Sequence, residues 1–526
     1  MALLGSLLKR GIKLTDVVSR KKLNPFKLQK KTLAKLIAKA RYTGFGQQYK
    51  FEEILSAALF EDGKAFYRKY TASVPIHDYN KMYQDWWHRS LNEEKDICWP
   101  GRVKYFALSS GTSEAASKYI PVTKAMSKAI QKTSIRQILT LGRYPHLPST
   151  LYEKGYLMLG GSTNLTFRGN HFEGDLSGIT ASQIPFWFQR FYKPGKAIAR
   201  ERDWAMKLDE ITAEAYKWDI GFVVGVPAWI QLLMEKIIAH YKVKNIHEIW
   251  PNLEVFCHGG VSFEPYKKGF QKLLGRPITY IETYLASEGF IAYQTHPGAE
   301  GMQLVVDNGL FYEFIPFTDE NFNSEGELIA QPTTLMIDEV EEGKEYALLL
   351  STCSGAWRYL IGDVIRFVSK DRCEIVITGR TKHFLSLCGE HLSVDNMNKA
   401  IELVSQEMGV TIREFTVAGI AYDTLFAHHW FVGTDDPVEA AEMRTRIDKK
   451  LKELNDDYGV ERRHALKDVF LTVLPSNVFY KWMEAKGKLG GQHKFPRVLR
   501  KNLIGDWENF LKHQGIDAEA ARTQKV

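Results

Sequence analysis

Residues 105–123 read YFALSSGTSEAASKYIPVT, and this stretch indicates the fold and a ligand more strongly than any other part of the chain. The apolar run Val103–Leu108 predicts a β-strand that leads into a loop of small residues, Ser109–Ser113. Small residues let backbone N–H groups approach phosphate oxygens, hydroxyls donate further hydrogen bonds, and Lys118 adds positive charge. The spacing is not that of a Walker loop. A Ser/Thr/Gly cluster alone is more often a polar turn, so the phosphate interpretation depends on the rest of the chain.

Short apolar runs alternate with helical stretches on both sides of this loop, through the first two-thirds of the chain. This alternation is typical of a βαβ sheet. Pro227 precedes an expected helix at Ala228–His240, where the missing N–H of a proline does no harm. The expected strands of the sheet are Gly155–Leu159, Phe222–Val224, Leu253–Cys257 and Ile278–Glu282.

The pattern changes after Gly301. Asp307-Asn308-Gly309 lies between two apolar runs, Gln303–Val306 and Leu310–Ile315, and predicts a β-hairpin. Further strands are expected in an antiparallel or barrel-like layer, and from His383 a separate α+β domain is expected. The fold class is therefore α/β, with a large N-terminal domain at residues 1–382 and a smaller α+β domain at residues 383–526. The expected elements are strands at Tyr346–Ser351, Val364–Val368, Glu374–Ile377, Phe415–Ile420, His429–Val432 and Val469–Leu474, and helices at Asp395–Ser405 and Pro437–Leu454.

The composition of the 526 residues is that of a globular protein. Hydrophobic residues make up 44% and charged residues 25%, which excludes a disordered or fibrous chain. No run approaches the roughly 20 apolar residues that a membrane span needs. Five cysteines show no C-x-x-C spacing, so neither a disulfide framework nor a zinc site is indicated. The N-terminus lacks the charge order of a secretory signal, and we expect a cytoplasmic protein.

Positive charge is concentrated at the N-terminus. Residues 1–50 hold 13 Lys and Arg against the single carboxylate of Asp16. A basic arm of this kind can contact nucleic acid or an anionic membrane. Leu33, Leu36, Ile37 and Ala40 recur at helical spacing, which favours an amphipathic helix packed on its own domain. We expect no nucleic-acid partner, since no recognition motif follows, and peripheral membrane contact by this arm is the weaker alternative.

Three more motifs follow in order. Thr283–Gly289 (TYLASEG) follows a strand and contains an aromatic ring suited to adenine, hydroxyls suited to phosphate and a carboxylate suited to Mg²⁺. Asp363 ends Tyr359–Asp363 (YLIGD) and could accept hydrogen bonds from ribose hydroxyls. Arg380 lies in Thr378–Lys382 (TGRTK), next to the change in composition. Each alone is more often a core aromatic, a turn or a surface ion pair, but four such pieces in this order are much less expected by chance.

In this order the motifs resemble the adenylate-forming superfamily of acyl-activating enzymes. Within it, the chain is similar to the Gretchen Hagen three family, the auxin-responsive acyl-acid amido synthetases, especially the bacterial branch. The resemblance covers nearly the whole chain. It is carried by Leu33–Phe51, the SSGTS loop, Gly225–Trp229, Trp250–Tyr266, the Thr283–Gly289 and Tyr359–Asp363 motifs, and Gly491–Val498.

The resemblance implies a role for each motif. Lys494 would be the mobile catalytic lysine that reaches the acyl phosphate, and a hinge near Lys382 would make residues 383–526 a lid over the adenylate-forming domain. Glu288 would be catalytic and would hold Mg²⁺, while Asp363 would bind the ribose with Arg380 nearby. Two departures stand out, Ala115 for a usual glycine and Leu285-Ala286 for a smaller pair. The remaining implied ATP contacts are Ser109, Ser110, Gly111, Thr112 and Ser113 at the phosphates, and Thr283, Tyr284 and Ser287 at the adenine and α-phosphate.

The implied reaction activates a small carboxylic acid with ATP and Mg²⁺ to an acyl-adenylate, and an amino-acid-like amine then attacks it to give an amide. One alternative is transfer to a thiol, of coenzyme A or of a carrier protein. Another, from a different class, is a non-catalytic nucleotide-binding scaffold. Candidates for the acyl pocket include Phe186–Phe188, although such aromatic runs are more often core. His258 is expected to be structural.

Overall fold

The computed structural model describes residues 24–523, apart from 61–62, 113–114, 262, 324–325, 330–331, 383, 487–494 and 500. The chain divides into two compact units. One comprises Met1–Ser109 and Tyr119–Thr381, and the other Ser110–Lys118 and Lys382–Val526. Within the described ranges, no helix is both long and apolar enough to cross a bilayer. The different roles expected for residues 1–382 and 383–526 stay a prediction.

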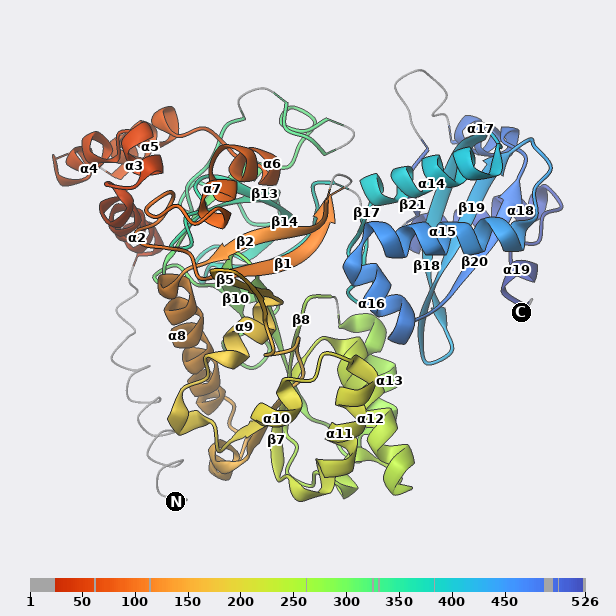
Figure 1. Ribbon diagram of the computed structural model, residues 1–526, viewed down its shortest axis with the longest axis horizontal. Helices are drawn as coiled ribbons and strands as arrows, with labels where there is room; N and C mark the ends of the chain where they lie inside the picture. Colours follow the sequence, from red (N-terminus) through yellow and green to blue (C-terminus); the bar gives the residue numbers. More distant parts are fainter. Residues whose placement is uncertain are drawn as a thin grey trace. The chain divides into compact units, whose positions relative to one another are not determined.

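A group of helices opens the described chain (Figure 1). Asn24 caps the first of them, α2, because its side chain accepts hydrogen bonds from the backbone N–H groups of Phe26 and Lys27. The four apolar residues expected on the inner face of this helix are all buried, which confirms the amphipathic helix. The helices are α2 (Pro25–Ala40), α3 (Gly44–Gln48), α4 (Phe51–Phe60), α5 (Gly63–Ser73), α6 (Tyr79–Met82) and α7 (His88–Leu91), with a π-helical turn at Tyr83–Trp87.

A four-stranded sheet contains the SSGTS segment. Its order is β2-β1-β5-β4, with β1 at Tyr105–Thr112, β2 at Ala115–Val122, β4 at Thr166–Arg168 and β5 at His171–Gly174. The expected loop at Ser109–Ser113 was wrong in its extent, because β1 continues to Thr112. Strand β1 lies between β2 and β5, and its pairing with β5 covers Tyr105–Ala107. The small residues continue the strand beyond that point, so the sheet context overrides their preference for a turn.

The main sheet has eleven strands in the order β12-β13-β14-β15-β11-β10-β9-β8-β7-β3-β6. Strands β6, β3, β7, β8 and β9 run parallel, as the βαβ pattern predicted, and the remainder pair antiparallel. Helix α8 packs against β10, and α12 packs against β7 (Figure 1). The strands are β3 (Gly155–Met158), β6 (Tyr192–Lys193), β7 (Ile220–Gly225), β8 (Val255–Gly259), β9 (Thr279–Ala286), β10 (Gly289–Tyr293), β11 (Met302–Leu304), β12 (Leu310–Pro316), β13 (Glu345–Thr352), β14 (Tyr359–Ser369) and β15 (Glu374–Arg380), and the helices of this region are α8 (Lys124–Thr140), α9 (Leu176–Ser182), α10 (Lys196–Ala199), α11 (Trp204–Glu214), α12 (Pro227–Tyr241) and α13 (Lys267–Leu273).

The hairpin expected around Asp307-Asn308-Gly309 was wrong. Both strands exist, but β11 pairs with β10 and β15, whereas β12 pairs with β13. The turn instead docks on α8. Asn308 Nδ2 donates to the carbonyl oxygen of Ala129 at 2.7 Å, and Arg136 binds Asp307 through two hydrogen bonds. These contacts turn the chain away from itself, so the local hairpin signal loses to tertiary docking.

The second unit is α+β, as expected. Its sheet has the order β20-β19-β18-β21. The carboxylate of Glu390 is fully buried, accepts hydrogen bonds from three backbone N–H groups at 387–389, and lies 2.9 Å from His428 Nε2. The elements are β16 (Phe384–Leu385), β17 (Leu392–Ser393), α14 (Val394–Met408), β18 (Ile412–Tyr422), β19 (Leu425–Thr434), α15 (Ala440–Leu454), α16 (Asp456–His464), β20 (Leu466–Leu474), α17 (Asn477–Ala485), β21 (Val498–Leu499), α18 (Lys501–His513) and α19 (Ala520–Thr523).

Candidate active site

Three of the predicted site residues form one hydrogen-bonded group. The hydroxyl of Tyr284, on β9, donates to Oδ2 of Asp363 on β14. The other carboxylate oxygen, Oδ1, pairs with Arg380 Nε at 2.8 Å, and Arg380 Nη2 donates to the carbonyl oxygen of Ile361 at 3.0 Å. The three motifs that carry these residues are therefore adjacent in space, as the sequence predicted.

The sheet must curl to bring these residues together. Asp363 and Arg380 are direct cross-strand partners on β14 and β15. Tyr284 lies on β9, which is four strands away from β14 in the sheet order. Strands are spaced by about 4.8 Å, so a flat sheet would separate the two by roughly 19 Å. Their hydrogen bond shows that the end of β14–β15 folds back over β9, in keeping with the barrel-like layer expected in this part of the chain.

Gly362 supports this geometry next to Asp363. Its φ of +91° lies in the region that only glycine adopts without strain. A Cβ at this position would lie 3.6 Å from Arg380 Nη2, which is ordinary contact, so the backbone conformation is what requires glycine. The carbonyl oxygen of Gly362 also accepts a hydrogen bond from the N–H of Thr381.

Glu288 lies at the turn between β9 and β10, and the residue is 7% exposed. The Tyr359 hydroxyl is its hydrogen-bond partner. Tyr359 opens β14 four residues before Asp363, so the two motifs again meet. The sequence placed Tyr359 within a motif but gave it no role of its own.

Burial and charge shape the protonation states here. Burial, reinforced by the Asp363 carboxylate, raises the pKa of Tyr284 well above its ordinary value. Burial and Glu288 do the same to the pKa of Tyr359. Burial alone would lower the pKa of Arg380, but Asp363 together with Tyr284, Glu288 and Tyr359 attracts the cation, and the pKa is raised. Both tyrosines therefore stay protonated hydrogen-bond donors, and Arg380 stays a cation.

This arrangement can bind the hydroxyl groups of a sugar. An ionised carboxylate offers about four lone-pair positions, and the two protein partners of Asp363 use only part of that capacity. The Asp363 side chain is 15% exposed, so it retains access from outside. A neutral diol would be held there by charge-assisted hydrogen bonds.

The structure describes only some of the other residues predicted to contact ATP. The hydroxyl of Thr283 accepts a hydrogen bond from Gln137 Nε2 of α8 at 2.7 Å, so the structure adds Gln137 to the site's surroundings. No sequence signal marks a lone glutamine on a helix. Ser287 is half-buried in the turn before Glu288, and Ser109 is half-buried on β1. Gly111 lies on β1, but the side chains of Ser110 and Thr112 and the whole of Ser113 and Lys494 lie outside what the structure describes.

A magnesium ion fits this site only with help from a nucleotide. Within the described ranges, no group of three or more His, Cys, Asp or Glu side chains is arranged to hold a metal. Mg²⁺ commonly uses one or two carboxylates together with substrate phosphates, and Glu288 alone meets that requirement. The donor set is compatible with a metal that enters with ATP.

The structure corrects the proposed acyl wall. Phe186 is 89% and Trp187 is 60% exposed, so neither ring lines a pocket, while Phe188 packs into the core. His258 is buried and stacks on Phe263 at a ring distance of 4.5 Å. This packing agrees with the structural role expected for His258.

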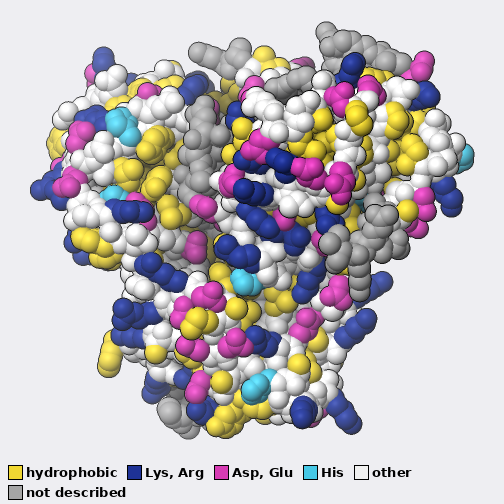
Figure 2. All heavy atoms as spheres, turned by 45° about the vertical axis from the view of Figure 1, so that its right-hand side comes forward, with side chains coloured by type: hydrophobic (Ala, Val, Ile, Leu, Met, Phe, Trp, Pro, Cys, Tyr) yellow, Lys and Arg dark blue, Asp and Glu magenta, His cyan; other side chains and the backbone are white. Residues whose placement is uncertain are grey.

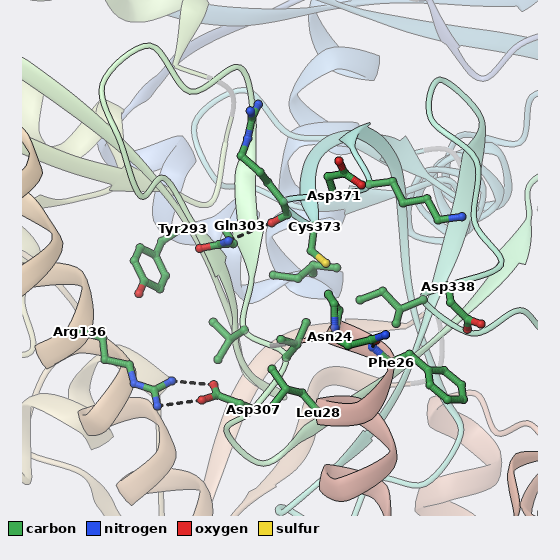
Figure 3. A pocket seen from close by; sticks show the side chains of 17 residues that line it. Asn24, Phe26, Leu28, Arg136, Tyr293, Gln303, Asp307, Asp338, Asp371 and Cys373 are labelled. Carbon is green, nitrogen blue, oxygen red and sulfur yellow. Dashed lines mark hydrogen bonds and ion pairs between the residues drawn. The ribbon is translucent and has the colours of Figure 1, made fainter. Parts of the chain in front are cut away.

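A cavity of about 700 Å³ lies elsewhere in the same unit (Figure 3). It is lined by the start of α2, by Tyr293 on β10, and by the turn between β14 and β15 that contains Cys373. The Arg136–Asp307 pair lies at its edge. None of the predicted nucleotide-binding residues lines it, so the cavity is separate from the candidate active site.

Comparison with solved structures defines the class of fold. The chain resembles "GH3.15 acyl acid amido synthetase" with a TM-score of 0.57 and 14% identity over 96% of each chain. It also resembles a 2-hydroxyisobutyryl-CoA ligase bound to 2-HIB-AMP and CoA, with a TM-score of 0.57 and 13% identity over 94% of this chain and 93% of that one. At such identities the likeness concerns the fold, which is that of adenylate-forming enzymes.

Family models then identify the chain more closely. The GH3 family N-terminal domain matches residues 16–208 and 170–278, the central domain matches 303–380, and the C-terminal domain matches 395–502. The chain therefore belongs to the GH3 family, which confirms the resemblance seen in the sequence.

Several relatives with similar sequences come from plants. A probable indole-3-acetic acid-amido synthetase of Oryza sativa subsp. japonica is 31% identical over 126 residues, 23% of this chain and 25% of that protein. An indole-3-acetic acid-amido synthetase of Arabidopsis thaliana is 26% identical over 184 residues, 32% of this chain and 30% of that protein. These alignments span only about a quarter to a third of the relatives' lengths. Membership of a bacterial branch stays a prediction.

Proposed function

We propose that this protein is an ATP-dependent acyl-acid amido synthetase that activates a small carboxylic acid as an acyl-adenylate and transfers it to an amino-acid-like amine. The observation that carries the proposal is the meeting of Tyr284, Glu288, Asp363 and Arg380 at one place in a chain of the GH3 family. These residues come from three motifs separated by up to about a hundred positions, and each supplies a group that a nucleotide needs.

The chemistry explains why such groups are required. A carboxylate resists nucleophiles, and its attack on the α-phosphate of ATP converts it into a mixed anhydride with AMP as leaving group. That transfer depends on positioning and charge neutralisation rather than on a covalent protein intermediate. Asp363 would hold the ribose and Arg380 would fix Asp363, while Glu288 would hold Mg²⁺, which neutralises phosphate charge when bound.

The remaining parts of the reaction are assigned to other segments. The Ser109–Ser113 segment would bind the phosphates, Thr283 and Ser287 would face the nucleotide, and Lys494 would neutralise charge at the α-phosphate. Residues 383–526 would act as a lid that keeps water from the reactive anhydride. We also propose a cytoplasmic location, where ATP and free amino acids are available.

Two other functions remain alternatives. Transfer to a thiol is supported by the likeness in fold to a CoA ligase, which concerns fold alone. A non-catalytic nucleotide-binding scaffold would bind ATP without carboxylate-dependent chemistry. The charged set Glu288, Asp363 and Arg380 favours catalysis, because a mere binding module has no need of a metal-binding carboxylate.

Pyrophosphate exchange with a panel of carboxylic acids tests the proposal. Exchange that depends on one class of acid supports activation, and mass spectrometry with amino acids or with coenzyme A identifies the acceptor. Glu288→Gln keeps the shape but removes the charge, and we expect exchange to fall by about 10²–10³-fold. Tyr359→Phe is the matched control, since it removes only the hydrogen bond to Glu288, and its loss should be much smaller. ATP binding without exchange for any acid would favour the scaffold.

A further inference from the structure

Phe186 and Trp187 form an exposed aromatic tip. They lie on a single 3₁₀ turn, Phe186–Phe188, and Phe186 at 89% is the most exposed large apolar side chain in the described part of the chain. Phe188 anchors the turn, because it packs against Tyr156 in the core at a ring distance of 5.0 Å. The aromatic pair is therefore held outward on a fixed base.

Helix α8 lies beside this tip. Gln131 Nε2 donates to the carbonyl oxygen of Gln183 at 2.9 Å, just before the 3₁₀ turn. One helical turn further, Ile135 is 39% exposed. Lys128 and Lys132 are exposed on the adjoining part of the same helix face. We define Phe186, Trp187, Ile135, Lys128 and Lys132 as the aromatic–lysine face.

The surroundings of this face are strongly basic. Residues 115–152 contain six Lys and Arg, and residues 176–200 contain four, while neither segment contains an Asp or Glu. Asp307 approaches α8, but both of its oxygens bind Arg136 (Figure 3). By contrast, Lys and Arg side chains are interspersed with Asp and Glu on the face shown in Figure 2. Positive charge therefore predominates in the two segments that carry the aromatic–lysine face.

Helix α2 adds a second row of lysines nearby. It carries exposed lysines at four-residue intervals, and no acidic residue within the helix balances them. Gln29 of α2 donates to the carbonyl oxygen of Val306, and Asn308 of the same turn donates to Ala129 of α8. The two helices thus flank one turn, and they are neighbours in Figure 1. The α2 lysines are Lys27, Lys31, Lys35 and Lys39.

We propose that the aromatic–lysine face binds an anionic lipid surface. Exposed Trp and Phe side chains beside Lys and Arg are the combination found where proteins enter the headgroup region of a bilayer. The lysines would be attracted by the negative leaflet, and the aromatic tip would enter among the headgroups. Single-stranded nucleic acid also attracts lysines and stacks on aromatic rings, but the aliphatic surface of Ile135 suits a headgroup region and offers a base nothing to stack on. The proposal concerns a peripheral contact and does not depend on the proposed enzymatic function.

Vesicle binding of the full-length protein tests the proposal. We expect co-sedimentation with vesicles containing about a third phosphatidylserine, none with pure phosphatidylcholine, and release at high salt. Lys128→Glu with Lys132→Glu should weaken partitioning by at least about 30-fold, given the worth of a lysine near such a surface. Phe186→Ala with Trp187→Ala should weaken it by at least about 10-fold. Tyr216→Ala is the matched control, because Tyr216 is 61% exposed but lies outside this face.

Brominated lipids locate the tip directly. They should quench part of the tryptophan fluorescence of the bound protein, and Trp187→Phe should remove that part while binding persists. Thermal melting checks that each variant folds. If the aromatic double variant does not fold, the variant with both lysine substitutions still tests the proposal. Equal binding to neutral and anionic vesicles would overturn the proposal, and so would unchanged partitioning of the lysine variant. The proposal would also fail if the wild type bound single-stranded DNA but no lipid, and the variants lost that DNA binding.

Discussion

At the scale of single residues, Asp363 links the candidate site together. It accepts a hydrogen bond from Tyr284 and pairs with Arg380 at 2.8 Å. Asp363→Asn keeps the shape but removes the charge that strengthens bonds to ribose hydroxyls, each worth about 1.5–3 kcal/mol. We expect the apparent KM for ATP to rise by roughly 10–100-fold. Tyr284→Phe is the comparison variant, because it keeps the aromatic ring expected at the adenine and the Asp363 carboxylate and removes only one hydroxyl donor.

A nucleotide without ribose hydroxyls separates this role from a structural one. With 2′,3′-dideoxy-ATP, the wild-type enzyme should lose affinity and Asp363→Asn should lose little more. Equal discrimination between the two nucleotides by wild type and variant would contradict the ribose assignment.

His258 makes a prediction about pH. Burial lowers its pKa to about 4, and its Nδ1 has no hydrogen-bond partner among the described residues. In the unfolded chain the pKa of His258 is about 6.5, so as the pH falls the unfolded state takes up a proton before the folded state does. Stability from neutral His258 is therefore complete above about pH 6.5 and is lost down to about pH 4, by about 2–3 kcal/mol at pH 4.5. His258→Phe keeps the stacking and should flatten this dependence. Urea unfolding above about pH 6.5 and at about pH 4.5 measures this loss of stability. Equal losses in the wild type and in His258→Phe would show that His258 does not cause the pH dependence.

At the scale of helices and strands, the buried parallel strands were predictable. Gly155–Leu159 was expected where β3 spans Gly155–Met158, and Leu253–Cys257 where β8 spans Val255–Gly259. Strands covered on both faces consist of continuous apolar runs, which local sequence reveals. It was not predictable that β11 and β12 pair with other strands instead of with each other, because contacts of their connecting turn with α8 decide this. The same limit applies to Gln137, whose partner Thr283 lies 146 positions away.

The site was predictable to the extent that its residues lie in local motifs. Tyr284 and Asp363 each follow or occupy a strand, with residue types that suit a nucleotide. Their direct hydrogen bond was not foreseen, because it depends on a curl across four strands that no single motif encodes. The exposure of Phe186 was equally hidden, since an aromatic run has the same composition in a core and on a surface.

A buried ion pair joins three elements and supports a prediction at this scale. Arg358, just before β14, binds Glu313 of β12 through Nε and Nη2, and both side chains are buried. Its Nη1 also donates to the carbonyl oxygens of Thr71 and Val74 at the end of α5. Removing one partner leaves the other charge buried without a counter-ion, so Arg358→Met and Glu313→Met should each destabilise the protein by about 3–5 kcal/mol. Denaturant unfolding should give a double variant clearly less destabilised than the sum. Additive losses would contradict direct coupling.

At the scale of the whole molecule, the proposed nucleotide site lies within one unit of the chain. Its residues lie between Gln137 and Arg380, all within the unit that ends at Thr381. The proposed reaction also needs Lys494, which follows more than a hundred positions later. The order of motifs along the entire chain revealed the family, but no local pattern determines how the two units cooperate in catalysis. A half-reaction experiment addresses that cooperation.

Lys494→Ala separates the two chemical steps. If this lysine neutralises charge while the carboxylate attacks the α-phosphate, its loss should reduce pyrophosphate exchange by about 10²–10³-fold. Amide formation from synthetic acyl-adenylate should suffer much less, because AMP already leaves readily from the mixed anhydride. Lys486→Ala is the matched control, since Lys486 precedes Lys494 in the same part of the chain and pairs with Asp506 at 2.8 Å. Its exchange rate should stay near that of the wild type. Wild-type exchange in Lys494→Ala, or equal loss in both steps, would exclude a lysine that acts in adenylation alone.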